Sequence, residues 1–455
     1  MADEPHPEAG HPREDASGSA SGRGSEPDRF VVHPSGPLSG TVCAGGAKNS
    51  ALKLMAACLL AEGRHVLSGI PRIVDVEIMA DLLSAIGVSI TRQESASEGG
   101  PGDLVVETPS KLVAEAPYEL VERLRASVVV LGPLLARCGF ARVSLPGGDD
   151  FGNRPVDIHL GAFSNMGASF QIVHGYIEGT VPKNGGSVAR MVGSRVVFEY
   201  PSHTATDNVL MAATLAKGTT VIENAAREPE VVDLASFLTK MGARIKGAGT
   251  SHVEVEGVEE LVPASHRVIP DRVVAATFLA AVGVAGGEVV VTDARADHMD
   301  MLLRKLSAMG VQVSQTPSGL SVAMDRKVHS VDVATLPYPG VATDYKPLLV
   351  AMLSIGDGVG IVTENLFQGR FRYVDELVRM GADIRTQGHH AVVRGVRRLS
   401  GAPVRAPDLR AGAALVLAGM VADGETVVSG ANHVDRGYER LAQKLASLGA
   451  QVWRA

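Results

Sequence analysis

The chain has 455 residues, of which 45% are hydrophobic and 20% charged, so most of it is expected to fold, as two or three domains. A net charge of −7 argues against a general nucleic-acid-binding protein, and an aromatic content of 4% disfavours base-stacking platforms. The three cysteines show no CxxC spacing and no neighbouring histidine cluster. Neither a disulfide framework nor a structural zinc site is therefore expected, and a reducing cytoplasm is the predicted setting.

The N-terminal segment is rich in Pro, Gly, Ser and acidic residues. Residues 1–28 lack the apolar stretch of a signal peptide and are predicted to form a disordered tail. No uninterrupted apolar run in the sequence approaches membrane-spanning length, so no membrane association is expected.

A short element recurs six times after the tail. Each copy follows a helical pattern, contains a glycine and leads into alternating apolar residues, as in MGARI at 241–245 and MGADI at 380–384. Each glycine is expected to end a helix before a strand. The six glycines are Gly87, Gly167, Gly242, Gly310, Gly381 and Gly449.

A second shared piece precedes each copy. It consists of an apolar helix, a β-branched strand, a turn and an acidic helix start, so each unit occupies about 70 residues. The first helix of each unit is apolar nearly all round and is expected to be buried. Six such units predict an α/β protein with two similar domains, in which the helices are buried and the sheets lie outside. The cleft between two domains is a preferred ligand site.

The loops that join the strand to the second helix carry the unusual residues. Residues 147–157 read GGDDFGNRPVD and combine glycines, which allow a loop to move, with adjacent acids suited to acid–base chemistry. An ordinary solvated turn fits the same residues. Three of the loops place an arginine at the same corner: Arg154, Arg370 and Arg436.

Basic residues also stand at predicted helix starts, at Lys48, Arg125, Arg272 and Arg410. Directed at one cleft, they would bind a multiply anionic substrate, because arginine binds phosphate and carboxylate bidentately and helix N-termini add backbone donors. Ordinary surface charges are an equally good interpretation. Asp344 is a second candidate acid, although Thr343 or Asp344 could instead cap the following helix.

Seven segments carry a resemblance: residues 45–63, 125–139, 145–157, 224–234, 342–347, 364–371 and 435–441. Together they resemble one known family, in order and with matching spacing over residues 30–455. This family is UDP-N-acetylglucosamine 1-carboxyvinyltransferase, an enolpyruvyl transferase. The resemblance implies two domains, each of three βαβαββ units in an inside-out α/β barrel, with an active-site cleft between them. The expected domains are residues 48–269 and residues 29–47 plus 270–455.

The resemblance implies a reaction that needs neither metal nor cofactor. A hydroxyl of UDP-N-acetylglucosamine adds to C2 of phosphoenolpyruvate, a tetrahedral intermediate forms, and phosphate leaves. Arginine and lysine side chains already in place would stabilise the developing charge. The product would be a peptidoglycan precursor made in the cytoplasm, and the oligomeric state is left open.

The matching positions imply roles for individual residues. Phosphoenolpyruvate would be bound by Lys48, Asn49, Arg154, Arg370, Arg410 and Arg436. The nucleotide would be bound by Arg125, Arg154, Pro155, Val156, Asp157, Ile158, Ser202, His203, Asp344 and Leu366. Catalytic roles fall to Lys48, Asp149, Asp344 and Arg436, with Asp344 as the base that contacts the attacking hydroxyl.

Asp149 stands where many members of the family have a cysteine as the general acid. A carboxyl group can protonate C3 of phosphoenolpyruvate if its pKa is raised, and the neighbouring Asp150 would raise it by like-charge repulsion. Asp149 is therefore the predicted general acid, with Asp150 as its substitute. Because fosfomycin alkylates the cysteine of the family, resistance to this drug is expected.

Two further departures fall on the acceptor side of the cleft. His203-Thr204 replaces a usual Val-Gly pair, and Val341-Ala342 stands where Phe-Pro is common. Neutral drift is one explanation. The other is a paralogue that enolpyruvylates UMP on the ribose 3′-hydroxyl in nikkomycin- or polyoxin-type antibiotic biosynthesis. A shikimate-pathway transferase fits the motifs less well, and the retained basic residues disfavour a non-catalytic protein.

Overall fold

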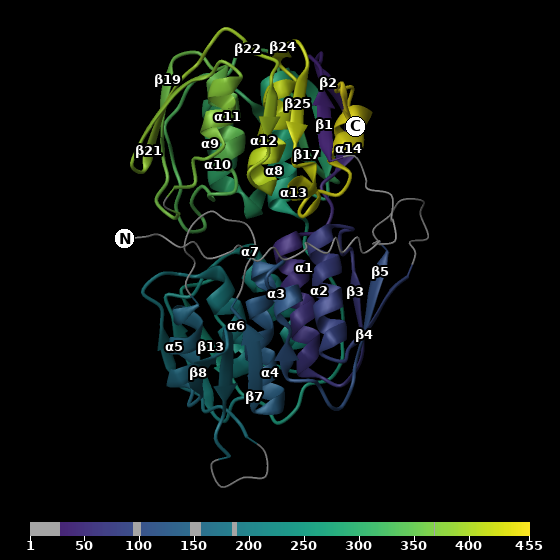
Figure 1. Cartoon of the computed structure of the whole chain (residues 1–455), viewed down its shortest axis with the longest axis vertical. Helices are drawn as coiled ribbons and strands as arrows, with labels where there is room; N and C mark the ends of the chain where they lie inside the picture. The colour runs from purple at the N-terminus through teal and green to yellow at the C-terminus, as the bar shows by residue number, and fades with distance from the viewer. Residues whose placement is uncertain (1–27, 94–101, 146–155, 184–188, 368) are drawn as a thin grey trace, which may run out of the picture.

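A computed structural model describes residues 28–93, 102–145, 156–183, 189–367 and 369–455, which form two stacked bodies (Figure 1). Each body has its own hydrophobic core. One core extends from Ala47 to Val268, and the other combines residues 30–44 with residues 273–452. These cores support the domain boundaries expected from the sequence, which we propose as the limits of the two domains. Most of the predicted tail lies outside the described residues.

Within the described ranges, six four-stranded sheets repeat one pattern of pairing. An edge strand runs parallel to the first strand of the unit, which pairs antiparallel with a third strand, and a fourth strand completes the sheet. In the first body, one sheet has the strand order β14 (Ser265–Arg267), β3 (Gly63–Ser68), β5 (Asp103–Thr108), β4 (Ser89–Gln93). The next has the order β6 (Glu115–Ala116), β7 (Phe140–Ser144), β9 (Tyr176–Thr180), β8 (Ser169–Val173). The third has the order β10 (Arg195–Val197), β11 (Thr219–Glu223), β13 (His252–Glu256), β12 (Arg244–Lys246). In the second body, the fourth sheet has the order β2 (Leu38–Cys43), β15 (Gly287–Thr292), β17 (Gly319–Met324), β16 (Gln312–Thr316). The fifth has the order β18 (Val333–Ala334), β19 (Val359–Thr363), β21 (His390–Arg394), β20 (Asp383–Gln387). The sixth has the order β23 (Pro403–Arg405), β25 (Thr426–Ser429), β1 (Arg29–Val32), β26 (Val452–Arg454).

The sixth sheet takes its third strand from the other end of the chain. Strand β1 pairs antiparallel with both β25 and β26. It occupies the third position of this sheet, which a strand of the unit itself occupies in the other five sheets. The N-terminal and C-terminal strands therefore lie in the same body, purple beside yellow in Figure 1. A short parallel pair, β22 (Leu399–Ser400) and β24 (Ala422–Asp423), lies apart from the six sheets.

The first helix of each unit is buried inside its body, as its apolar sequence predicts. All eleven residues of α12 (Leu409–Gly419) are buried, and this helix contacts both α8 (Arg272–Ala285) and α10 (Lys346–Ser354). In the other body, α4 (Leu131–Cys138) contacts α6 (His203–Ala213). The third buried first helix of that body is α1 (Lys48–Ala57). The polar termini of such buried helices need partners, and Asp271 and Asp408 supply side-chain caps at the starts of α8 and α12.

The second helix of each unit ends at one of the six glycines. All six have a φ between +88° and +106°, a conformation that favours glycine, so the predicted helix stop is confirmed. These helices are α2 (Val74–Ala85), α5 (Asp157–Asn165), α7 (Pro229–Lys240), α9 (Asp300–Ala308), α11 (Val374–Arg379) and α14 (Leu441–Ser447). The remaining short helices are α3 (Tyr118–Val121), α13 (Ala431–Asp435), η1 (Cys58–Leu60), η2 (Arg125–Val130) and η3 (Ala296–His298).

The two chain crossings between the bodies run side by side. Ala47 N–H donates to Ile269 O and Asp271 N–H donates to Gly45 O, both at 2.8 Å. The Asp271 carboxylate caps α8 by accepting from Val273 N and Val274 N, and it also accepts from Lys48 N at 3.0 Å. Asp271 therefore fixes the first turns of α1 and α8 against each other, at the level where the bodies meet.

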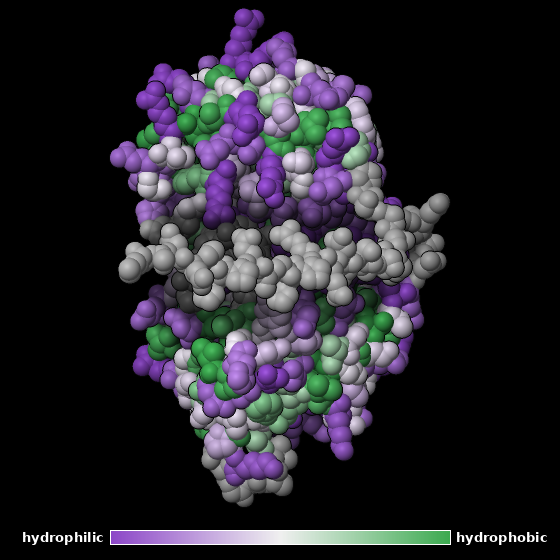
Figure 2. Space-filling view, in the orientation of Figure 1, coloured by the Kyte–Doolittle hydropathy of each residue, from purple (hydrophilic) through white to green (hydrophobic). Residues whose placement is uncertain are grey.

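The surface of the described part is mixed. On the face in Figure 2, hydrophobic residues form separate groups between hydrophilic ones on both bodies. No helix among the described residues has the length and hydrophobicity needed to cross a membrane.

Candidate active site

A cavity of about 480 Å³ lies between the two bodies. Its walls include the first turns of α1, α6, α8 and α12 together with residues 336–338, 342–344, 366–367 and 370. Among the described residues, seven basic and three acidic side chains line it. Helix N-termini and excess positive charge both favour anions, and the volume suits a small-molecule ligand.

Most of the predicted site residues that the structure describes meet in this cavity. Asp157 is the exception among them, since it begins α5 and is not part of the described lining. Asp149, Asp150, Arg154 and Pro155 lie outside the described residues. Those that line the cavity are Lys48, Asn49, Arg125, Val156, Ile158, Ser202, His203, Asp344, Leu366, Arg370, Arg410 and Arg436.

Asp75 joins cations from the two bodies. Its carboxylate lies 2.5 Å from Lys48 Nζ and 2.8 Å from Arg436 Nε, and its side chain is 2% exposed. Arg436 follows α13 in the second body, whereas Lys48 and Asp75 belong to the first, so this contact bridges the cavity. Gly437 makes the close approach possible, because a Cβ there would come within 2.3 Å of Leu409 and 3.6 Å of the Lys48 side chain.

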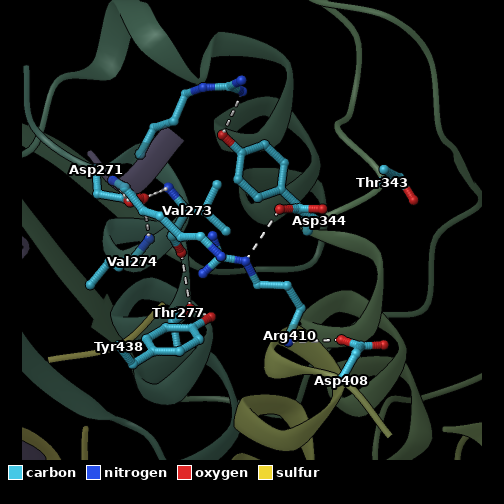
Figure 3. A network of polar contacts seen from close by, with 12 residues as sticks. Asp271, Val273, Val274, Thr277, Thr343, Asp344, Asp408, Arg410 and Tyr438 are labelled. Carbon is cyan, nitrogen blue, oxygen red and sulfur yellow. Dashed lines mark hydrogen bonds and ion pairs between the residues drawn. The ribbon is translucent and has the colours of Figure 1, made fainter. Parts of the chain in front are cut away.

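Asp344 holds two further cations. Its carboxylate lies 2.9 Å from Arg370 Nη1. It also lies 3.2 Å from Arg410 Nε (Figure 3). Burial lowers the pKa of Arg410, but Tyr438 and Asp344 more than offset this effect and raise it above its ordinary value. Helix α10 has Tyr345 as its N-cap and no side-chain cap, so the alternative that Thr343 or Asp344 caps this helix is wrong.

A buried Lys346–Glu364 pair supports the loops on either side of Asp344. Lys346 Nζ lies 2.8 Å from Glu364 and donates to the Arg370 carbonyl at 2.5 Å. Glu364 also accepts from the hydroxyls of Thr343 and Thr335, each at 2.7 Å. Burial lowers the pKa of Lys346 to about 8. This network fixes the backbone that presents Asp344 and Arg370 to the cavity.

Arg272 and Glu230 form an ion pair at the edge of the cavity, with side chains 8% and 3% exposed. Glu230 accepts from Arg272 Nε at 3.0 Å and from Nη2 at 3.3 Å. Arg272 Nη1 donates to the hydroxyl of Tyr345 at 3.2 Å. Although burial by itself would raise it, Arg272 lowers the pKa of Glu230 to about 2.

Replacing Glu230 with glutamine is expected to destabilise the protein by about 3–5 kcal/mol at pH 7, because the buried Arg272 loses its ion-pair partner. The pKa of Glu230 falls from 4.5 to about 2 on folding, so its contribution is complete above pH 4.5 and is lost as the pH falls toward 2. Urea unfolding at pH 7 and at decreasing pH should show that the unfolding free energy of the wild type exceeds that of Glu230→Gln, and that this difference shrinks below pH 4.5. Glu223→Gln removes an exposed pair with Arg195 and should cost less than about 1 kcal/mol. Equal losses in the two variants would contradict this account.

Sequence reasoning missed several residues of this site. Asp75, Lys53, His159 and Glu228 line the cavity, and Glu364 and Lys346 support it from behind. Asp75 stands in an acidic helix start of the repeat, which was its only signal. No group of three or more His, Cys, Asp or Glu that could hold a metal ion occurs among the described residues.

Two repeated α/β bodies that enclose a basic cavity define a protein that handles a small, multiply anionic molecule. Comparison with known proteins makes this class specific. The family of EPSP synthase (3-phosphoshikimate 1-carboxyvinyltransferase) matches residues 32–445. The chain belongs to this family of enolpyruvyl transferases.

The similar sequences share one name. A UDP-N-acetylglucosamine 1-carboxyvinyltransferase from Nocardia farcinica is 47% identical over 430 residues, which cover 94% of this chain and 98% of the relative. A protein named UDP-N-acetylglucosamine 1-carboxyvinyltransferase 1, from Caldanaerobacter subterraneus, is 46% identical, with 94% and 99% covered.

The similar structures show the inside-out α/β barrel fold. The enolpyruvyl transferase NikO from Streptomyces tendae superposes with a TM-score of 0.82 at 23% identity, covering 95% of this chain and 99% of NikO. EPSP synthase from Acinetobacter baumannii superposes with a TM-score of 0.71 at 18% identity, covering 93% of this chain and 99% of that enzyme. The fold expected from the six repeats and the family resemblance is therefore confirmed.

Proposed function

We propose that the protein transfers the enolpyruvyl group of phosphoenolpyruvate to the 3-hydroxyl of UDP-N-acetylglucosamine, releases phosphate and thereby makes a peptidoglycan precursor. The observation that carries this proposal is the convergence of Lys48, Arg370, Arg410 and Arg436 on one cavity between the bodies. Phosphoenolpyruvate brings a phosphate and a carboxylate, and cations already in place bind such groups with little reorganisation. Relatives that are 46% to 48% identical over 94% of the chain are named for this acceptor.

The proposed chemistry proceeds by addition and elimination. The acceptor oxygen bonds to C2 of phosphoenolpyruvate, its proton passes to Asp344, and C3 gains a proton from Asp149. The Asp149 carboxylate then takes a proton back from C3 as phosphate departs from C2, and the double bond is restored. The two arginines on Asp344 stabilise it as a carboxylate, the form that can accept a proton. Asp149 enters this scheme from the sequence alone.

The nucleotide is proposed to lie against Arg125, residues 156–158, Ser202 and Leu366. Apart from Asp157, these residues line the cavity together with Asp344, so a nucleotide there would lie beside the proposed base. The substrates are small and water-soluble, and we place the reaction in the cytoplasm.

A second acceptor, UMP, is favoured by one observation. His203 and Thr204, which depart from the usual residues of the family, both line the cavity and could shape it for a smaller nucleotide. Phosphate release with phosphoenolpyruvate and each acceptor in turn separates the two functions. We expect kcat/KM for UDP-N-acetylglucosamine to exceed that for UMP by at least about 100-fold. Activity with UMP and none with UDP-N-acetylglucosamine would overturn the proposal.

A further inference from the structure

His203 reaches the cavity from the first turn of α6. Its side chain is 20% exposed, and Ser202, which precedes it, caps the helix by accepting from Ala205 N. One turn later, on the same face, stands Asp207, and its Oδ2 lies 3.2 Å from His203 Nε2. The imidazole therefore has one nitrogen toward a carboxylate.

Asp207 is fully buried and shared between two groups. Lys53, from α1, places its Nζ 3.5 Å from the same Oδ2 that faces His203. Neither oxygen of Asp207 nor Nε2 of His203 makes a hydrogen bond of good geometry with any described residue. A buried carboxylate with unused hydrogen-bonding capacity is costly, and a full N–H donor from His203 would relieve that cost.

No described residue forms a hydrogen bond with the other nitrogen, His203 Nδ1, and this atom is not among the buried polar atoms that lack a partner. Because His203 lines the cavity, this nitrogen is the one available to a ligand there. Charged groups face His203 from several elements: Lys53 on α1, Glu230 on α7, Arg272 on α8 and Asp344 before α10. Arg272 already pairs with Glu230, and Lys53 with Asp207.

We propose that His203 and Asp207 act as a proton-binding pair that recognises the anionic phosphate part of the acceptor nucleotide. When the nucleotide binds, the imidazole takes up one proton, so that Nε2–H donates to Asp207 and Nδ1–H donates to the phosphate. No bond between heavy atoms changes: the imidazole gains an N–H bond, and its proton comes from solvent or, where Asp207 is protonated, from the O–H bond of that carboxyl group. This inference rests on the proposed function, because it requires a nucleotide acceptor. It adds a specificity determinant that prefers phosphorylated acceptors to uncharged nucleosides.

The protonation states of the free protein fit this role. Burial lowers the pKa of His203 to about 3, so the free imidazole is neutral. Burial raises the pKa of Asp207 to about 7. Above pH 7 the carboxylate is mostly ionised and the pair holds no proton, so the uptake on binding must come from solvent. Below pH 7 Asp207 already holds a proton that can pass to His203, and the uptake decreases.

Calorimetric titration with UDP-N-acetylglucosamine in two buffers of different ionisation enthalpy measures this proton uptake. We expect about one proton per nucleotide at pH 8 and clearly less at pH 6. Uridine, which lacks a phosphate, should bind without uptake. His203→Val and His203→Gln should abolish the uptake and weaken nucleotide binding roughly 10- to 100-fold. His252→Gln, at an exposed histidine, should change neither quantity.

The outcomes separate this inference from the function on which it rests. Nucleotide binding by the wild type without buffer dependence at pH 8 overturns the role of His203 and leaves the proposed function standing. Proton uptake that persists in a folded His203→Gln protein likewise overturns the role of His203 and leaves the proposed function standing. Failure of both UDP-N-acetylglucosamine and UMP to bind would overturn the proposed function and this inference together.

Discussion

Asp344→Asn is expected to lower kcat by about 10²- to 10⁴-fold, with a much smaller change in the KM for phosphoenolpyruvate. Asparagine keeps the size of the side chain and can still accept a hydrogen bond from Arg370 or Arg410, so the site should keep its shape. It cannot accept the proton of the attacking hydroxyl. Because Asp344 lines the cavity and is held by Arg370 and by Arg410 of α12, the loss should fall on the chemical step.

Steady-state phosphate release measures this effect. Asp357→Asn is the matched control, because Asp357 lies in the same body, has a side chain that is 73% exposed and contacts only Lys327 among ion-pair partners described, at 4.0 Å. It should retain wild-type kcat. An Asp344→Asn protein that keeps more than about a tenth of wild-type kcat would remove Asp344 from the role of base.

Asp149→Asn is expected to cause a loss of similar size, about 10²- to 10⁴-fold in kcat, because the amide cannot protonate C3 of phosphoenolpyruvate. Asp149 lies outside the described residues, so this prediction rests on the sequence and the family resemblance. Asp150→Asn is the matched control and should have a smaller effect if Asp149 is the donor. The reverse order would assign the donor role to Asp150.

The reaction with fosfomycin tests the same position independently. A carboxylate is a much weaker nucleophile than a thiolate, so the wild type should stay unmodified while Asp149→Cys gains one covalently bound drug molecule. Intact-protein mass spectrometry after incubation with the drug distinguishes the two. Stoichiometric labelling of the wild type within residues 147–157 would contradict the assignment.

Much of the fold could be predicted because its signals are local. Each glycine at the end of a second helix marks a backbone position with positive φ, and each apolar helix marks a buried element, so six units are visible in the sequence. The pairing of β1 with β25 and β26 could not be predicted in this way. It joins the two ends of the chain and depends on which strand fills a vacant position in the last sheet.

The candidate site, like the fold, could be predicted only in part from the sequence. Basic residues at helix starts were visible as candidates, and the family resemblance supplied roles for them. Their partners were not visible, since Asp75 and Arg436 are 361 positions apart and the carboxylate that neutralises a cation leaves no periodic signal. The same holds for Glu364 with Lys346 and for Asp207 with Lys53, which are buried pairs between separate elements.

The identity of the reaction product tests the central proposal most directly. Incubation with phosphoenolpyruvate and UDP-N-acetylglucosamine, followed by NMR spectroscopy of the nucleotide product, should show a vinyl ether on the 3-hydroxyl of the sugar and an equal amount of inorganic phosphate. An unmodified UDP-N-acetylglucosamine, together with an enolpyruvyl ether on the ribose when UMP is supplied instead, would contradict it.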